Sequence, residues 1–138
     1  IPSPVDIRAP RGNGNPMIQS LIPVALGGAL GSVARFLTVT AAARIAPGWP
    51  MGTLAVNVLG SFAMGVLFVV LAQRSQLSPL LMTGILGGFT TFSAFSLDAL
   101  KLWQAGQPVQ AAVYVAASVG LSLFAVALGA ALAKGALG

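Results

Sequence analysis

Apolar residues run along this chain in four long stretches, separated by short connections rich in Pro, Gly and polar residues. The stretches cover residues 20–43, 52–71, 79–100 and 109–133. Each supplies the roughly 20 residues that a helix needs to cross a bilayer. The pattern therefore predicts an all-α integral membrane protein with four transmembrane helices.

The third stretch contains a polar interruption. Residues 84–96 combine three glycines, two threonines, two serines and three phenylalanines. Hydrocarbon offers no water to loosened backbone, so such a segment is tolerated only where it is buried in protein or lines a polar cavity. Substrate and ion sites are often built from helices broken in this way. We predict that the third helix breaks mid-membrane at Gly87-Gly88, and that the function lies there.

Composition agrees with a membrane protein and excludes several chemistries. Of the 138 residues, 57% are hydrophobic and 7% are charged, whereas soluble domains carry about 25% charged residues. Cysteine and histidine are absent, which excludes thiol chemistry and removes the usual general base. The chain shows no Walker loop, no metal-ligand cluster and no nucleophile–base pair. We therefore expect no enzymatic activity.

The net charge of +5 comes from seven Lys and Arg residues against Asp6 and Asp98. The cations are scattered singly, without a basic patch, so we interpret them as interface anchors and expect no nucleic-acid partner. The two membrane faces carry nearly equal numbers of Lys and Arg residues. An excess of these residues on one face is what sets the orientation of a membrane protein. A weak bias permits insertion both ways, and so small a chain encloses no wide pathway alone. We predict an antiparallel, dual-topology homodimer.

The chain ends and connections have an expected arrangement. Trp49 and Trp103 fall in the two connections expected on one membrane side, as in an interfacial aromatic belt, so both chain ends are expected on the other side. Residues 1–16 are polar and lack the apolar core of a signal peptide. We expect them to form a flexible leader before a single membrane domain of residues 17–138, with Met17 as a natural start.

Polar groups inside the spans are candidates for function. Asn57 must hydrogen-bond at its depth, because a bare amide in an apolar medium costs several kcal/mol; it either joins helices or donates to an anion. Tyr114, Ser118 and Ser122 follow an i, i+4, i+8 spacing that places three hydroxyls in one stripe. A single serine often bonds to the carbonyl one turn back, but three in register favour the wall of a polar path.

Phe92 and Phe95 share one face of the second half of the third span. They either pack in the usual way or turn the positive edges of their rings toward an anion, and the flanking hydroxyls favour the second interpretation. Arg35 lies near the end of the first span, as a snorkelling anchor or as a residue that concentrates anions at a vestibule. Asp98 and Lys101 are spaced to pair on the last helical turn, so we interpret Asp98 as structural.

Three motifs resemble those of the small fluoride channels of the Fluc/CrcB family, and they occur in the same order. They are Gly27-Gly28-x-x-Gly31-x-x-x-Arg35-Phe36, Gly52-Thr53-Leu54-x-Val56-Asn57-x-x-Gly60-Ser61 and Gly87-Gly88-Phe89-Thr90-Thr91-Phe92-Ser93-x-Phe95-Ser96. The resemblance runs from about Met17 to the C-terminus. Asp98 stands where the family usually has glutamate, and Phe36 where tyrosine is common.

The resemblance implies an antiparallel homodimer with two fluoride pores in a bacterial inner membrane, with fluoride, membrane lipid and a second copy as partners. It implies that Arg35 lies near the vestibule. It also implies a structural sodium ion at the dimer interface, held by the backbone carbonyls of Gly87 and Thr90. The implied pore residues are Asn57, Phe92, Phe95, Tyr114, Ser118 and Ser122.

The leading hypothesis is thus a channel for passive export of fluoride from the cytoplasm. Closely placed neutral donors suit it, because conduction needs weak binding at several sites and the spans carry no deep cation. The alternative is a small dual-topology transporter of cationic compounds, but the first span lacks the acidic residue that such a transporter needs. A membrane-assembly protein without transport activity would leave the polar stripe unexplained.

Overall fold

The computed structural model describes residues 15–138, and residues 1–14 of the predicted leader lie outside this part of the chain. Of the last two leader residues, Pro16 begins the first helix and Asn15 is its N-cap. Helix α1 (Pro16–Ile45) begins with a proline, whose missing N–H is no loss in a first turn. The Asn15 side chain caps this turn by accepting a hydrogen bond from the Met17 N–H at 3.0 Å.

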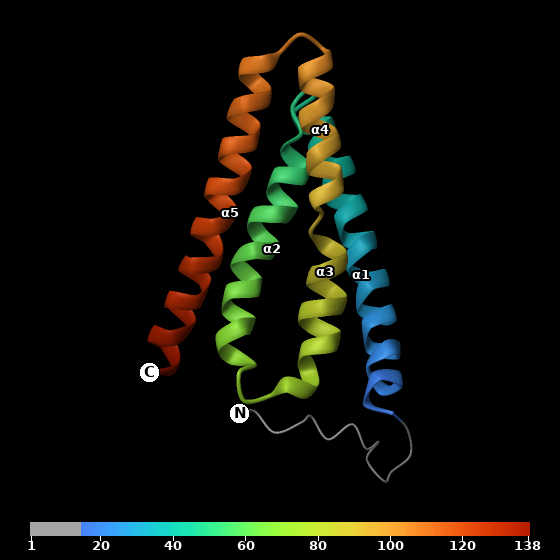
Figure 1. Cartoon of the computed structure of the whole chain (residues 1–138), viewed down its shortest axis with the longest axis vertical. Helices are drawn as coiled ribbons and strands as arrows, with labels where there is room; N and C mark the ends of the chain where they lie inside the picture. Colours follow the sequence, from blue (N-terminus) through green and yellow to red (C-terminus); the bar gives the residue numbers. More distant parts are fainter. Residues whose placement is uncertain (1–14) are drawn as a thin grey trace, which may run out of the picture.

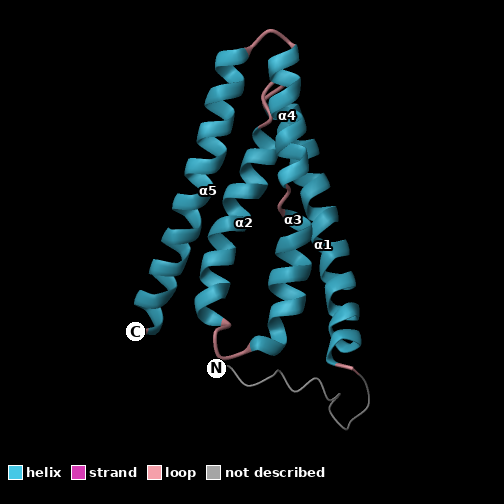
Figure 2. Ribbon diagram, in the orientation of Figure 1, coloured by secondary structure: helices cyan, strands magenta, loops and turns pink. Residues whose placement is uncertain are grey.

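The described part of the chain is helical, as Figure 2 shows. After α1 come α2 (Met51–Val70), the short 3₁₀ turn η1 (Ser75–Leu77), the π-helix η2 (Pro79–Leu86), α3 (Gly87–Phe89), α4 (Phe92–Gln104) and α5 (Pro108–Leu137). Four segments are long and apolar enough to cross a membrane: Pro16–Ile45, Met51–Val70, Ser75–Gln104 and Pro108–Leu137. This confirms the predicted spans and shows a multi-pass membrane protein.

The chain runs up and down through these spans, so that α1 begins at the same end of the bundle where α5 finishes (Figure 1). The α1–α2 and α4–α5 connections share the opposite end. Each contains a glycine in the left-handed region, Gly48 at φ +87° and Gly106 at φ +75°. Trp49 and Trp103 therefore lie at one end, as predicted, and both side chains are exposed.

The break in the third span lies at Thr90 and Thr91, three residues beyond the predicted position at Gly87. Thr90 (φ −86°, ψ 158°) and Thr91 (φ −156°, ψ 122°) are both extended. Gly87 and Gly88 stay helical in α3. Glycine at position 88 serves close helix packing and not the break, because a Cβ there would lie 2.6 Å from the Gly28 carbonyl oxygen of α1.

Close helix crossings at glycines hold the bundle together. In α1, a Cβ at Gly27 would lie 2.6 Å from the Leu80 carbonyl oxygen, so α1 packs against η2 backbone to backbone. In the other pair, a Cβ at Gly65 of α2 would overlap the Val126 carbonyl, and one at Gly129 of α5 would overlap the Phe62 carbonyl. Small residues permit such approach in membrane proteins, where dispersion contacts rather than water exclusion drive helix association.

Candidate functional site

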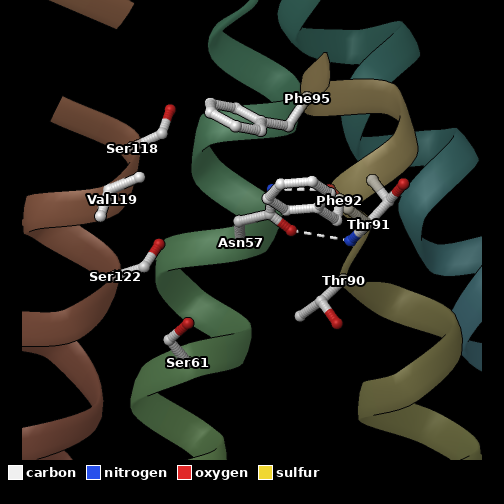
Figure 3. Close-up of a pocket in the computed structure, with 9 residues that line it drawn as sticks. All are labelled: Asn57, Ser61, Thr90, Thr91, Phe92, Phe95, Ser118, Val119 and Ser122. Atoms are coloured by element: carbon white, nitrogen blue, oxygen red, sulfur yellow. Dashed lines mark hydrogen bonds between the residues drawn. The ribbon is translucent and has the colours of Figure 1, made fainter. Parts of the chain in front are cut away.

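A cavity of about 260 Å³ lies beside the break, between α2, α4 and α5 (Figure 3). It brings together five of the six predicted pore residues, from three helices. The predicted residues that line it are Asn57, Phe92, Phe95, Ser118 and Ser122. Ser61, Thr90, Thr91 and Val119 complete the wall, and the lining contains no charged side chain.

Asn57 holds the break in place through two hydrogen bonds to a single residue. Its Nδ2 donates to the Thr91 carbonyl at 2.9 Å, and its Oδ1 accepts from the Thr91 N–H at 2.7 Å. The amide therefore supplies the donor and the acceptor that the broken helix lacks, in the manner of a neighbouring strand. An Asn side chain has two N–H groups, so the second Nδ2–H is available to the cavity. The joining and donating interpretations of Asn57 are compatible.

The break also redirects the hydrogen bonds that an unbroken helix would make. Thr91 N–H, the usual partner of the Gly87 carbonyl, donates to Asn57. Ala94 N–H, the usual partner of the Thr90 carbonyl, donates instead to the Thr91 hydroxyl at 3.1 Å, which caps α4. The carbonyls of Gly87 and Thr90 thus both lose their helical donors at one point in the fold.

Arg35 supplies a donor for a third carbonyl at the break. Its Nε donates to the Gly88 carbonyl at 3.1 Å. The prediction that Arg35 lies near the end of its span was wrong, because α1 continues to Ile45 and Arg35 packs beside the break. A separate cavity, lined by Thr53 and Asp98 among others, contains this guanidinium. The spans therefore do carry a deep cation, although it lies outside the cavity of Asn57.

The serine hydroxyls of α5 differ from other span hydroxyls in their bonding. Ser96 and Thr38 donate to carbonyls one turn back, at 3.0 and 2.8 Å. Ser118 is only 5% exposed, and its Oγ has no hydrogen-bond partner within residues 15–138. Figure 3 shows Ser118 and Ser122 projecting from α5 toward the residues of α2 and α4. Back-bonding to the helix, the plain structural role considered for these serines, is therefore wrong for Ser118.

The two phenylalanines are neighbours, as their spacing predicted, but their surroundings differ. Their ring centroids lie 5.5 Å apart with the planes tilted by 51°. Phe95 is 8% exposed and packs against Tyr114, with ring centroids 5.3 Å apart. Phe92 is 77% exposed. One copy of the chain therefore encloses one ring and leaves the other open.

Tyr114 is the predicted pore residue that lies outside the cavity lining. Its hydroxyl donates to the Asp98 carboxylate at 3.2 Å, linking α5 to α4. The predicted Asp98–Lys101 ion pair does not form within the described residues. The Asp98 carboxylate instead turns toward Tyr114 and toward the cavity that Arg35 also lines. Asp98 is thus structural through a different partner from the one predicted.

Ser61 and Thr91 line the cavity although neither is among the predicted site residues. Ser61 follows Asn57 by one helical turn, so its spacing alone could have placed it on the same face. Thr91 enters the site through its backbone, and no side-chain pattern signals that.

No group of three or more His, Cys, Asp or Glu side chains gathers anywhere in residues 15–138. A cation at the break would therefore depend on carbonyl oxygens.

Comparison with known proteins identifies the family. Residues 22–130 match the family described as CrcB-like protein, Camphor Resistance (CrcB). A protein of Cereibacter sphaeroides named fluoride-specific ion channel FluC is 58% identical over 121 residues, which cover 86% of this chain and 98% of the relative. Proteins of the same name from Paracoccus denitrificans and Rhizobium etli are 51% and 52% identical, over the same shares of both chains. The chain belongs to the CrcB family.

Proposed function

We propose that this protein is a fluoride-selective ion channel that passively exports fluoride from the cytoplasm, and not an enzyme. The names of its relatives supply the ion. The observation that carries the proposal is the set of neutral donors around one cavity: the unpartnered Ser118 hydroxyl, Ser122, and the second N–H of Asn57. Fluoride is small and strongly hydrated, so several close donors must replace its water.

The chemistry of the lining suits conduction. No charged side chain lines the cavity, so an anion is bound by partial charges alone and can leave again. The rings of Phe92 and Phe95 add positive edges beside the hydroxyls. Arg35 donates to Gly88 and lies in a separate cavity, where its charge raises the local anion concentration without trapping the ion in the path. We therefore assign Arg35 to a vestibule that reaches inward as far as the break.

A second copy of the chain is needed to complete the path. The cavity is open, and Phe92 is 77% exposed although it lies at the centre of the candidate site. A homodimer would cover this ring and close each cavity, giving two pores. Arg74 and Lys134 lie at one end of the bundle, and Arg44 and Lys101 at the other. This balance supports dual topology and an antiparallel pair, in a bacterial inner membrane.

A sodium ion at the dimer axis fits the freed carbonyls. Gly87 and Thr90 both lose their helical N–H donors to Asn57 and to the Thr91 hydroxyl. In a single copy Gly87 is exposed and Thr90 is partly buried, so a second copy would bury these carbonyls. Carbonyls buried at such an interface need a partner, and a hard monovalent cation accepts oxygen ligands. Two such carbonyls from each of two copies would surround one ion, whose charge would stabilise anions nearby without a titrating side chain.

Fluoride efflux from liposomes tests the function directly. Purified protein in vesicles loaded with potassium fluoride should release fluoride to an external electrode when valinomycin balances the charge. Vesicles loaded with potassium chloride should release little chloride in the same assay. Release of a cationic compound in place of fluoride would favour a transporter, and no release of any ion would contradict the channel.

A further inference from the structure

A second groove, far from the break, joins apolar and positively charged surface. It has a volume of about 520 Å³ and lies between the end of α2, the η1–η2 segment and the last turns of α5. Figure 1 shows this end of the bundle, where α2 finishes and α5 approaches the C-terminus. Leu67 and Phe68 line its span side, and Ser75, Ser78 and Lys134 line its polar side.

The charge at this groove is uncompensated within the described residues. Lys134 is exposed and forms no ion pair with any residue from 15 to 138. Arg74 lies in the adjoining turn. The only acidic side chain in residues 15–138, that of Asp98, lines a pocket with Trp49 at the opposite end of the bundle. An anionic group would complement the groove.

The hydroxyls beside Lys134 can exchange their partners. Ser75 makes no side-chain hydrogen bond within the described residues. Ser78 Oγ donates only to the Met82 sulfur at 3.5 Å, and a thioether is a weak acceptor. A phosphate oxygen would be a much better acceptor for either hydroxyl. Phe68, 65% exposed, leaves a broad apolar surface next to this polar corner.

We propose that this groove binds one acidic phospholipid, with its phosphate at Lys134 and the two serine hydroxyls and an acyl chain along Leu67 and Phe68. A phospholipid supplies an anion and a hydrocarbon chain from one molecule, which matches the two halves of the lining. A free anion would leave the apolar half uncovered. The groove lies where a span meets its polar connection, which is the depth of lipid headgroups.

Native mass spectrometry in neutral detergent tests the headgroup preference. We expect the protein to retain phosphatidylglycerol in preference to phosphatidylcholine with the same acyl chains. Lys134→Gln should weaken the affinity for phosphatidylglycerol about fivefold, read from a lipid titration, from the contribution of one lysine near an anionic surface. Lys134→Arg should restore it. Lys101→Gln makes the same charge change at the other end and should have no effect; an equal loss there would contradict the proposal.

A single-thiol experiment separates a lipid from other occupants, because the chain contains no cysteine. Ser75→Cys should react with a maleimide more slowly in phosphatidylglycerol vesicles than in phosphatidylcholine vesicles. Inorganic phosphate in the buffer should not slow the reaction; equal protection by phosphate would show a free-anion site. Phe68→Cys should not form a disulfide-linked dimer on oxidation, since such a dimer would show that a second copy covers the groove. Unchanged fluoride efflux by Lys134→Gln establishes that the variant is folded.

Discussion

Asn57 and Thr91 form a reciprocal pair across two helices: the amide donates to the Thr91 carbonyl at 2.9 Å and accepts from its N–H at 2.7 Å. The residue expected to face the ion thus also holds the chain break that creates the site. Structure and conduction are linked at this residue, so stability and transport must be measured together in its variants.

Asn57→Asp should abolish fluoride flux and also lower stability. An ionised carboxylate has no N–H for the Thr91 carbonyl and repels an anion where the amide donates. Leaving that carbonyl without its donor should cost about 1–3 kcal/mol. Liposome efflux and thermal unfolding in detergent measure the two effects. Gln107→Glu makes the same chemical change in the exposed α4–α5 connection and should leave both unchanged. Parental efflux from a folded Asn57→Asp variant would remove this residue from the pore.

Phe92→Ile and Phe95→Ile should both reduce fluoride flux sharply, because isoleucine fills space without a polarised ring edge. Their stabilities should differ. Phe95 is 8% exposed and packs on Tyr114, so its variant should lose about 1 kcal/mol, whereas Phe92 is 77% exposed and its variant should unfold like the parent in monomeric form. Phe124→Ile, on α5 outside the cavity, is the control. If both ring variants conduct at the parental rate, the rings only pack.

Ser118→Ala should slow fluoride efflux while the fold remains intact. The Ser118 hydroxyl is buried without a partner, so its removal should leave stability unchanged or raise it by up to about 1 kcal/mol. A hydrogen bond to a charged group contributes about 1.5–3 kcal/mol, so the loss of one donor should slow efflux about ten- to a hundredfold. Ser96→Ala, whose hydroxyl bonds to the Phe92 carbonyl at 3.0 Å, is the matched control. Equal efflux from both variants would contradict a pore role for Ser118.

Gly129→Ala should destabilise the crossing of α2 and α5. Its Cβ would overlap the Phe62 carbonyl, and backbone yields only by separating the helices. We expect a loss of about 1–3 kcal/mol or more in thermal unfolding, followed by circular dichroism. Gly120→Ala lies on the same helix with nothing within 4 Å of its Cβ. It should be neutral or slightly stabilising, and similar melting of the two variants would show that the crossing tolerates a methyl group.

The proposed sodium ion should be detectable without any transport measurement. In a crystal of the protein, density between the Gly87 and Thr90 carbonyls of the two copies should have ligand distances and geometry suited to sodium. Density for water, or distances too long for sodium, would rule the ion out. Replacing sodium by N-methylglucamine throughout purification should lower the melting temperature, and potassium should restore it less well than sodium.

The membrane class, the number of spans and the polar composition of the site could be predicted from the sequence, because they depend on local properties. Span length and hydropathy decide which segments enter a bilayer. Helical spacing alone placed Ser118 and Ser122 on one face, and Phe92 beside Phe95, and the structure agrees. In these cases each residue's position relative to its own helix carries the information.

Only the tertiary structure decided which partners those residues meet. The break falls at Thr90 and Thr91 because Asn57, 34 residues away, bonds to the Thr91 backbone. Arg35 reaches the break because the α1–η2 crossing at glycines brings it within 3.1 Å of the Gly88 carbonyl. Asp98 turns from Lys101 to Tyr114 for a similar reason. Each outcome depends on helices that are distant in sequence but in contact in space, so no local pattern could specify it.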